Sequence, residues 1–213
     1  MYKAFLKRLI DIVLSALGII ILAIPMLIVA LIIKIDDPGP ALFKQKRVGL
    51  HKKTFMLYKF RSMKMSTPHD VPTHMLENPE QYLLGIGKFI RKFSIDELPQ
   101  MFNIFLGSMT IIGPRPALWN QDDLIAERDK YGANDVKPGL TGWAQINGRD
   151  ELPIEVKAKL DGEYVEKFGF GMDVRCFFGT IFKVLRHDGV VEGGTGAMEE
   201  KNKEKTEEEK IAK

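Results

Sequence analysis

The longest hydrophobic stretch of this chain lies near its N-terminus, between Ile12 and Ile33, and it contains no charged side chain. A helix of about 22 residues spans roughly 30 Å, which is the thickness of the hydrocarbon core of a bilayer. The stretch is longer than the apolar part of a signal peptide, and no small-residue cleavage site closes it. We therefore predict a membrane helix that stays in the mature protein.

Pro25 lies in the middle of this stretch. Its nitrogen cannot donate to the carbonyl of Ile21 and its ring crowds the preceding turn, so we expect a kink there. Basic residues flank both ends, with Lys3, Lys7 and Arg8 before the stretch and Lys34, Lys44, Lys46 and Arg47 after it. Because positive charge marks the cytoplasmic side, two basic flanks favour a re-entrant helix, which enters the membrane, bends and returns. A kinked helix that spans the bilayer is the alternative.

The cluster Asp36-Asp37-Pro38-Gly39-Pro40 breaks the helix and begins a second part of the chain. There the pattern predicts short strands at 41–48, 54–63 and 109–112, and helices at 79–93, 94–106, 117–131, 152–168 and 172–187. Several helices with a few short strands predict the α+β class. We divide the chain into a membrane helix at 1–36, a mostly helical domain at 37–192 and a flexible charged tail at 193–213, which has too few apolar residues to form a core.

The predicted helix at 172–187 has the most regular amphipathic pattern of the second part. Its apolar residues form one stripe, made of Val174, Phe177, Phe178, Ile181, Phe182 and Leu185. Packing into the core is the simplest interpretation. A helix that lies on a membrane surface shows the same pattern, and the stripe also allows a homodimer.

Charge and cysteine content exclude several classes of protein. The formal net charge is +3, which is smaller and less clustered than in nucleic-acid-binding proteins, so we expect no nucleic-acid partner. Cys176 is the one cysteine, so an internal disulfide is impossible. The four histidines are scattered and do not have the spacing of a zinc site.

Asp96 and Glu97 are adjacent acids at the start of a predicted helix, within Ser94-Ile95-Asp96-Glu97-Leu98-Pro99-Gln100. Paired acids with nearby basic residues suit chemistry on phosphates, with a hard divalent cation between the charges. A structural alternative is strong, because Ser-x-x-Glu is also a capping box in which Glu97 reaches back to the amide of Ser94. The helix dipole likewise favours an acid such as Asp96 in a first turn.

Basic residues precede and follow these acids. Lys59 and Arg61 are two positions apart in a predicted strand and therefore share a face, where two cations suit a diphosphate and a solvated surface is the alternative. Arg91 lies near the end of a helix, where the dipole also favours a cation. Arg115 lies between two prolines that fix its backbone, so we favour an anion contact for its guanidinium.

The ordered set of motifs resembles one protein family. The set consists of the basic N-terminus with its apolar helix, Tyr58-Lys59-Phe60-Arg61-Ser62-Met63, Arg91-x-x-Ser94-x-Asp96-Glu97-Leu98-Pro99-Gln100, Gly113-Pro114-Arg115-Pro116, Lys137-Pro138-Gly139-x-Thr141-Gly142 and Gln145-x-Asn147-Gly148-Arg149. Over roughly residues 1 to 190 it is similar to the bacterial sugar transferases, the small monotopic phosphoglycosyl transferases that initiate glycoconjugate assembly. The family commonly has serine before the proline of its re-entrant helix, whereas Ile24 precedes Pro25 here.

The resemblance implies transfer of a phosphosugar from a UDP-sugar to undecaprenyl phosphate, with release of UMP and a requirement for Mg²⁺. Asp96 would be the nucleophile that carries a covalent phosphosugar, and Glu97 together with Asp96 would hold the metal. The expected substrate-binding residues are Lys59, Arg61, Arg91, Arg115 and, in a supporting role, Asp173. Direct one-step transfer is one alternative, and a non-catalytic membrane-anchored scaffold is another.

The resemblance also implies a location and a set of partners. Because undecaprenyl phosphate stays in the bilayer, we expect the protein on the cytoplasmic face of the bacterial inner membrane. Its product would begin a capsule, exopolysaccharide, O-antigen or glycoprotein glycan and would pass to downstream glycosyltransferases.

Overall fold

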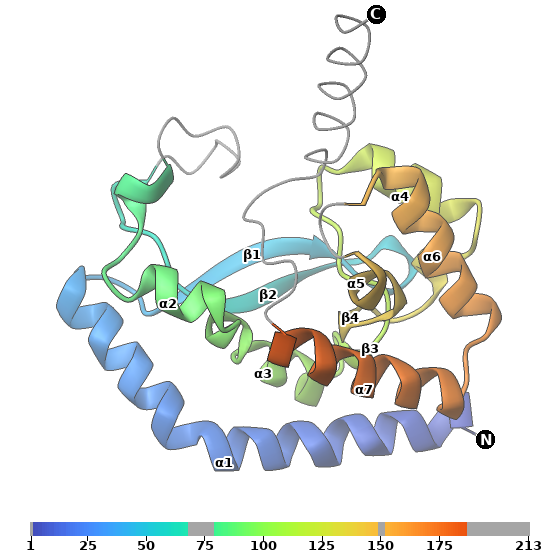
Figure 1. Cartoon of the computed structure of the whole chain (residues 1–213), viewed down its shortest axis with the longest axis horizontal. Helices are drawn as coiled ribbons and strands as arrows, with labels where there is room; N and C mark the ends of the chain where they lie inside the picture. Colours follow the sequence, from blue (N-terminus) through green and yellow to red (C-terminus); the bar gives the residue numbers. More distant parts are fainter. Residues whose placement is uncertain (1, 68–78, 149–151, 187–213) are drawn as a thin grey trace, which may run out of the picture.

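The computed structural model describes residues 2–67, 79–148 and 152–186. These residues form a mixed helix-and-strand fold, as expected from the sequence (Figure 1). The tail expected at 193–213 and Arg149 lie outside the described residues, and so does most of the segment 66–79.

The elements follow one another closely along the chain. A π-helical turn at Tyr2–Leu6 leads into α1 (Lys7–Asp36), and a hairpin of β1 (Leu42–Val48) and β2 (Thr54–Phe60) comes next. The later elements are α2 (Gly87–Lys92), α3 (Gln100–Leu106), β3 (Thr110–Ile112), α4 (Asp122–Asp129), β4 (Gly139–Thr141), α5 (Trp143–Asn147), α6 (Ile154–Glu166) and α7 (Phe170–Arg186). Short 3-10 turns lie at Leu50–Lys52, Pro79–Tyr82, Ile95–Glu97 and Ala133–Asp135.

The apolar stretch forms α1, a continuous helix that includes Pro25. Figure 1 shows α1 along the lower edge of the domain, where its axis turns part-way so that its last turns rise toward the hairpin. Within the described ranges it is the one helix that is long and apolar enough to cross a membrane, judged by length and composition. Most of its large apolar side chains are exposed, which is consistent with a membrane anchor.

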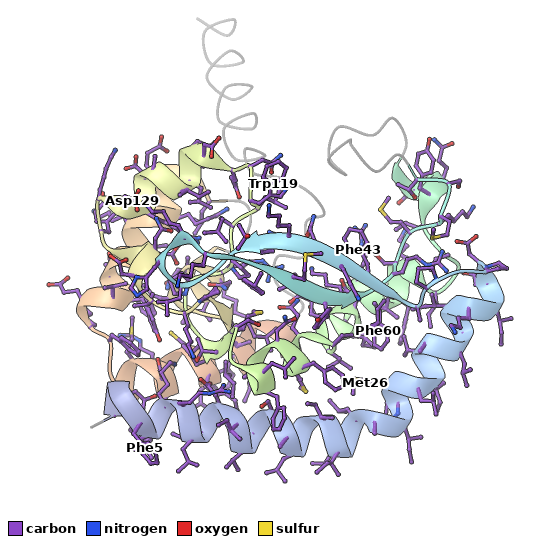
Figure 2. The ribbon with its side chains drawn as sticks, turned by 180° about the vertical axis from the view of Figure 1, so that it is seen from behind. Phe5, Met26, Phe43, Phe60, Trp119 and Asp129 are labelled. Carbon is purple, nitrogen blue, oxygen red and sulfur yellow. The ribbon has the colours of Figure 1, made fainter. Side chains whose placement is uncertain are left out.

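Two different kinds of contact attach α1 to the domain. Its buried residues are polar in the first half, at Lys7, Asp11 and Ser15, and apolar in the second half, at Met26 and Ile33. Met26 and Ile33 pack into a core cluster with residues of β2, α2 and the loop between them (Figure 2). Hydrogen bonds and ion pairs therefore fix the beginning of the helix, and hydrophobic burial together with polar contacts of Asp36 and Asp37 fixes its end.

The β1–β2 hairpin is antiparallel, with Leu42 opposite Phe60 at its open end and Val48 opposite Thr54 at its turn. Phe43 is opposite Lys59. β2 ends at Phe60, so the strand predicted to residue 63 is too long, although the Arg61 amide still donates to the Ala41 carbonyl at 2.8 Å. The guanidinium of Arg61 binds the carboxylate and carbonyl of Asp37 at the end of α1.

β3 and β4 form a small parallel sheet, with Thr110 opposite Gly139. Beyond its end, the Gly113 amide donates to the Thr141 carbonyl at 2.8 Å. A Cβ atom on Gly139 would lie only 2.1 Å from the Gly113 nitrogen, so the two backbones can approach this closely because residue 139 is glycine. The glycine-rich segment after Lys137 therefore supports the turn that carries Arg115.

The remaining core is divided into small clusters around β3. One cluster joins β2 to α3, and another joins Ile112 of β3 to Tyr164 of α6 and Cys176 of α7. Core packing is the wrong interpretation for much of the apolar stripe on α7. Its exposed members are Phe177, Phe178, Ile181 and Phe182.

Candidate active site

Asp96 and Glu97 lie in the 3-10 turn Ile95–Glu97, and the chain keeps right-handed helical backbone angles through Leu98 and Pro99 into α3. Ser94, just before this turn, has a φ of 54° in the left-handed region and makes no side-chain cap hydrogen bond. The capping-box interpretation of Glu97 is therefore wrong. Cationic side chains from two other parts of the fold bind its carboxylate instead.

Glu97 is the best-bound acid of the pair. Lys59 Nζ donates to its Oε1 at 2.8 Å, and Arg115 donates to Oε1 at 2.7 Å and to Oε2 at 3.5 Å. Burial alone would raise the pKa of Glu97, but the charges of Arg115 and Lys59 outweigh burial and hold the pKa below its ordinary value. Glu97 is therefore a permanent anion that orients both cations.

Asp96 has a more distant cationic partner than Glu97, and its pKa is shifted in the opposite direction. It is buried, with 8% of its surface exposed, and its Oδ2 lies 4.0 Å from Lys59 Nζ. Burial raises the pKa of Asp96 to about 6, although Lys59, Arg91 and Arg115 each favour the charged form. A carboxyl group that is weakly solvated and titrates near neutral pH is typical of catalytic positions.

Three basic residues converge on these two acids from separate elements. Lys59 comes from β2, Arg91 from α2 and Arg115 from the turn after β3. We call these five residues the Asp96 cluster. Its positive charges outnumber its negative charges, and the difference grows when Asp96 is protonated. Such a surplus suits a phosphate or diphosphate.

Asn103 sets the relative position of the two elements that carry Lys59 and Asp96. This buried residue of α3 accepts a hydrogen bond from the Tyr58 amide at 2.9 Å and donates to the Met56 carbonyl at 2.8 Å. Both bonds go to the backbone of β2 just before Lys59. The sequence pattern did not predict this role, and the available signal was that Asn103 and Gln100 are the two amide side chains in a helix whose other residues are apolar.

Comparison with known proteins agrees with this geometry. Residues 2–187 match the family model described as bacterial sugar transferase. The sugar transferase EpsL of Bacillus subtilis is 39% identical over 185 residues, covering 87% of this chain and 90% of EpsL. The exopolysaccharide production protein PSS of Rhizobium leguminosarum is 35% identical over 192 residues, covering 84% of this chain and 95% of PSS.

This chain belongs to the bacterial sugar transferase family. A longer relative is the UDP-glucose:undecaprenyl-phosphate glucose-1-phosphate transferase of Escherichia coli, which is 37% identical over 191 residues. The alignment covers 84% of this chain but only 40% of that relative. The part shared with all three relatives includes most of the described residues.

Two of the residues expected to bind substrate have other partners in this sugar transferase. The Arg61 guanidinium binds Asp37 and the Pro40 carbonyl, so it braces the junction between α1 and β1 and does not join the Asp96 cluster. Asp173 accepts hydrogen bonds from Lys7 Nζ and Tyr2 OH at 2.5 Å each. The structure therefore brings together Lys59, Arg91 and Arg115 and places Arg61 and Asp173 in structural contacts.

The donor atoms of the site suit a hard divalent cation, because such ions prefer carboxylate oxygens. In the part of the chain that the structure describes, no group of three or more His, Cys, Asp and Glu side chains is arranged to hold a metal. Mg²⁺ commonly binds one or two carboxylates and completes its shell with substrate phosphates and water. Asp96 and Glu97 therefore fit Mg²⁺ in combination with a bound diphosphate.

Proposed function

We propose that this protein transfers a phosphosugar from a UDP-sugar to undecaprenyl phosphate, with UMP as the second product. The observation that carries the proposal is the environment of Asp96, a buried carboxyl with a pKa of about 6 beside a fixed anion and three cations. Family membership supports it, since the Escherichia coli relative is named for this type of transfer.

The first step is a displacement at the phosphorus that bears the sugar. An Asp96 carboxylate oxygen forms a bond to this phosphorus while the bond to the bridging oxygen breaks, and UMP leaves with the electron pair. The phosphosugar is then held on Asp96 as an acyl phosphate. Asp96 must be ionised to attack, and a pKa of about 6 leaves it mostly ionised at neutral pH.

The second step transfers the phosphosugar to the lipid. A phosphate oxygen of undecaprenyl phosphate attacks the same phosphorus, the bond to Asp96 breaks, and the carboxylate is regenerated. The product is undecaprenyl-diphosphate-sugar. Two displacements with a good leaving group in each replace a single difficult one.

The cations of the Asp96 cluster orient the diphosphate and neutralise the charge that develops during each displacement. Arg115 is already held in place by Glu97, so little reorganisation is needed when the substrate binds. Mg²⁺ held by Asp96, Glu97 and the diphosphate would add positive charge next to the transferred phosphoryl group.

A re-entrant path for α1, with the domain on the cytoplasmic face of the inner membrane, completes the proposal. Both ends of α1 contact the same domain: Arg8 donates to the Ile104 carbonyl at 2.6 Å, and the Asp36 carboxylate accepts from the Gly85 amide at 2.6 Å. A straight helix that crossed the membrane would carry one end roughly 30 Å away from the other. Contacts at both ends, with Pro25 between them, favour a helix that returns to its starting side.

Intact-protein mass spectrometry tests the covalent step. The purified protein is incubated with Mg²⁺ and a panel of UDP-sugars in the absence of lipid acceptor. We expect the mass to increase by one phosphosugar with the correct donor, and Asp96→Asn to show no increase. Asp122→Asn, which changes an exposed acid at the start of α4, is the matched control and should gain the same mass as the wild type.

The other outcomes are equally informative. Lipid product without any mass gain would contradict the covalent intermediate and favour direct one-step transfer. Absence of lipid product with every UDP-sugar tested would contradict the proposed transfer itself and favour a non-catalytic scaffold.

A further inference from the structure

We propose that the first half of α1 positions the active site through hydrogen bonds to β3 and α3, in addition to anchoring the protein. The proposal rests on the proposed function, because its consequence is a change in phosphosugar transfer. Figure 1 shows this half of α1 running along the domain near α3 and α7. Its polar residues Lys7, Arg8 and Asp11 reach the elements that carry or adjoin the Asp96 cluster.

Asp11 makes the most direct contact with β3. Its carboxylate accepts a hydrogen bond from the Thr110 hydroxyl at 2.7 Å and another from the Ile111 amide at 2.9 Å. Asp11 is 3% exposed and Thr110 is 1% exposed, so the bond between them is shielded from water, and the bond to the Ile111 amide is partly buried. One edge of β3 pairs with β4, and the Asp11 carboxylate binds an amide on the other edge.

Lys7 continues this contact toward Arg115. Its ammonium donates to the Ile112 carbonyl at 2.9 Å, and the Tyr164 hydroxyl oxygen lies 3.0 Å from the same carbonyl oxygen. Asp173 accepts from both donors, from Lys7 at 2.5 Å and from Tyr164 at 2.8 Å, and so fixes their positions. Arg115 follows Ile112 by three residues, so side chains of α1 hold the strand from which its turn begins.

Arg8 makes a parallel contact with α3, the helix that continues from Asp96 and Glu97. Its guanidinium donates to the Ile104 carbonyl at 2.6 Å and to the Phe105 carbonyl at 2.8 Å. A cation at the C-terminal end of a helix satisfies carbonyls that have no partner within the helix. The first half of α1 therefore contacts the supports of both Arg115 and Asp96.

The burial of Asp11 is difficult to explain by anchoring alone. A carboxylate in a membrane helix is costly and has no role in holding an apolar surface in lipid. Ser15, one turn later and 2% exposed, provides the contrast because its hydroxyl donates within its own helix, to the carbonyl of Asp11 at 2.5 Å. Asp11 thus connects α1 to β3, whereas Ser15 makes its hydrogen bond within α1.

The test compares Asp11→Asn with the matched control Ser15→Ala in the full-length protein, in detergent with lipid acceptor and in vesicles. We expect Asp11→Asn to lower kcat about tenfold, because a small displacement of a catalytic group is enough for such a loss. Vesicle binding should be unchanged, and Ser15→Ala should retain wild-type kcat. Thr110→Val, which removes one of the two donors, should lower kcat about threefold.

A double-variant cycle separates positioning from general destabilisation. In an Arg115→Ala background, adding Asp11→Asn should change kcat by less than about twofold if the effect passes through Arg115. The proposal would be overturned if the double variant lost kcat by the product of the two single-variant losses. Identical kcat values for Asp11→Asn and Ser15→Ala would overturn it as well.

Amide hydrogen exchange tests the inference with a measurement that does not depend on enzymatic activity. Asp11→Asn should speed exchange of the amides between residues 110 and 115, since the Ile111 amide then has a neutral and weaker acceptor in place of a carboxylate. Unchanged exchange would overturn the inferred contact even if no UDP-sugar were turned over. A wild-type protein that transfers no phosphosugar while exchange responds as expected would contradict the proposed function and not the contact.

Discussion

Two groups of buried charges in this protein use the same residue types in different ways. Between α4 and α6, Arg128 binds Asp161 through Nε at 2.8 Å and NH2 at 2.6 Å, and their side chains are 4% and 0% exposed. In the Asp96 cluster the side chains of Lys59 and Asp96 are 19% and 11% exposed. One group is closed to solvent, and the other retains access and a surplus of positive charge.

The difference shows which feature marks a functional site. Burial and ion pairing occur in both groups, so neither of them identifies chemistry. What distinguishes the Asp96 cluster is that three cations converge on an accessible carboxyl and a second, fixed one. The Arg128–Asp161 pair has no access for a ligand and serves the packing of α4 on α6.

Removal of a cation from the Asp96 cluster should have the largest effect on activity. We expect Arg115→Ala to lower kcat about a hundredfold, because its guanidinium stabilises charge that develops during phosphoryl transfer. Steady-state kinetics with saturating UDP-sugar measures the loss. A raised KM with normal kcat would instead indicate that Arg115 binds the ground state and transition state equally.

Removal of the cation from the closed pair should affect stability and not chemistry. Arg128→Met leaves the Asp161 carboxylate buried without its guanidinium, and we expect the free energy of unfolding to fall by about 3 to 5 kcal/mol. Urea titration gives this value, and activity per folded molecule should be retained. Adding Asp161→Leu should recover most of the loss. Failure of the double variant to recover would show that the pair contributes more than mutual neutralisation.

The pH dependence of transfer should report Asp96. Its pKa of about 6 predicts that kcat/KM falls as pH decreases below about 6, since the protonated acid cannot attack. Arg91 favours the charged form, so Arg91→Gln should move this limb to higher pH. A limb near pH 4 in the wild type would contradict the raised pKa.

The same pKa has a consequence for stability. The folded protein holds the Asp96 proton to a higher pH than the unfolded chain, whose ordinary value is 3.8. The free energy of unfolding should therefore decrease as pH rises from about 4 to about 6. Asp96→Asn should remove this decrease and raise Tm at neutral pH relative to the wild type.

A surface ion pair provides the smallest expected effect. Lys88 Nζ lies 3.3 Å from Glu80 Oε1, and both side chains are more than three-quarters exposed, at 76% and 77%. Lys88→Ala should change the free energy of unfolding by less than about 0.5 kcal/mol and leave kcat unchanged. A loss of activity in this variant would extend the functional surface from Arg91 to the first turn of α2.

Local pattern was sufficient to predict the apolar helix and the mixture of helices and short strands, and it singled out five charged residues that lie close together in the fold. Asp96, Glu97, Lys59, Arg91 and Arg115 were identified from their chemistry and their motifs, and the structure brings them together. Adjacent acids, and an arginine between two prolines, can be recognised in the sequence without knowledge of the fold.

Tertiary structure alone decided the partners of Arg61, Asp173 and Asp11. Arg61 was expected beside Lys59 because strand residues two apart share a face, but β2 ends at Phe60 and Arg61 turns to Asp37. Asp173 binds Lys7, which is 166 residues away in the chain. Pairings between such distant residues leave no periodic signal. Sequence by itself determined which charges this protein carries, and packing determined which of them neutralise one another and which leave a surplus of positive charge around Asp96.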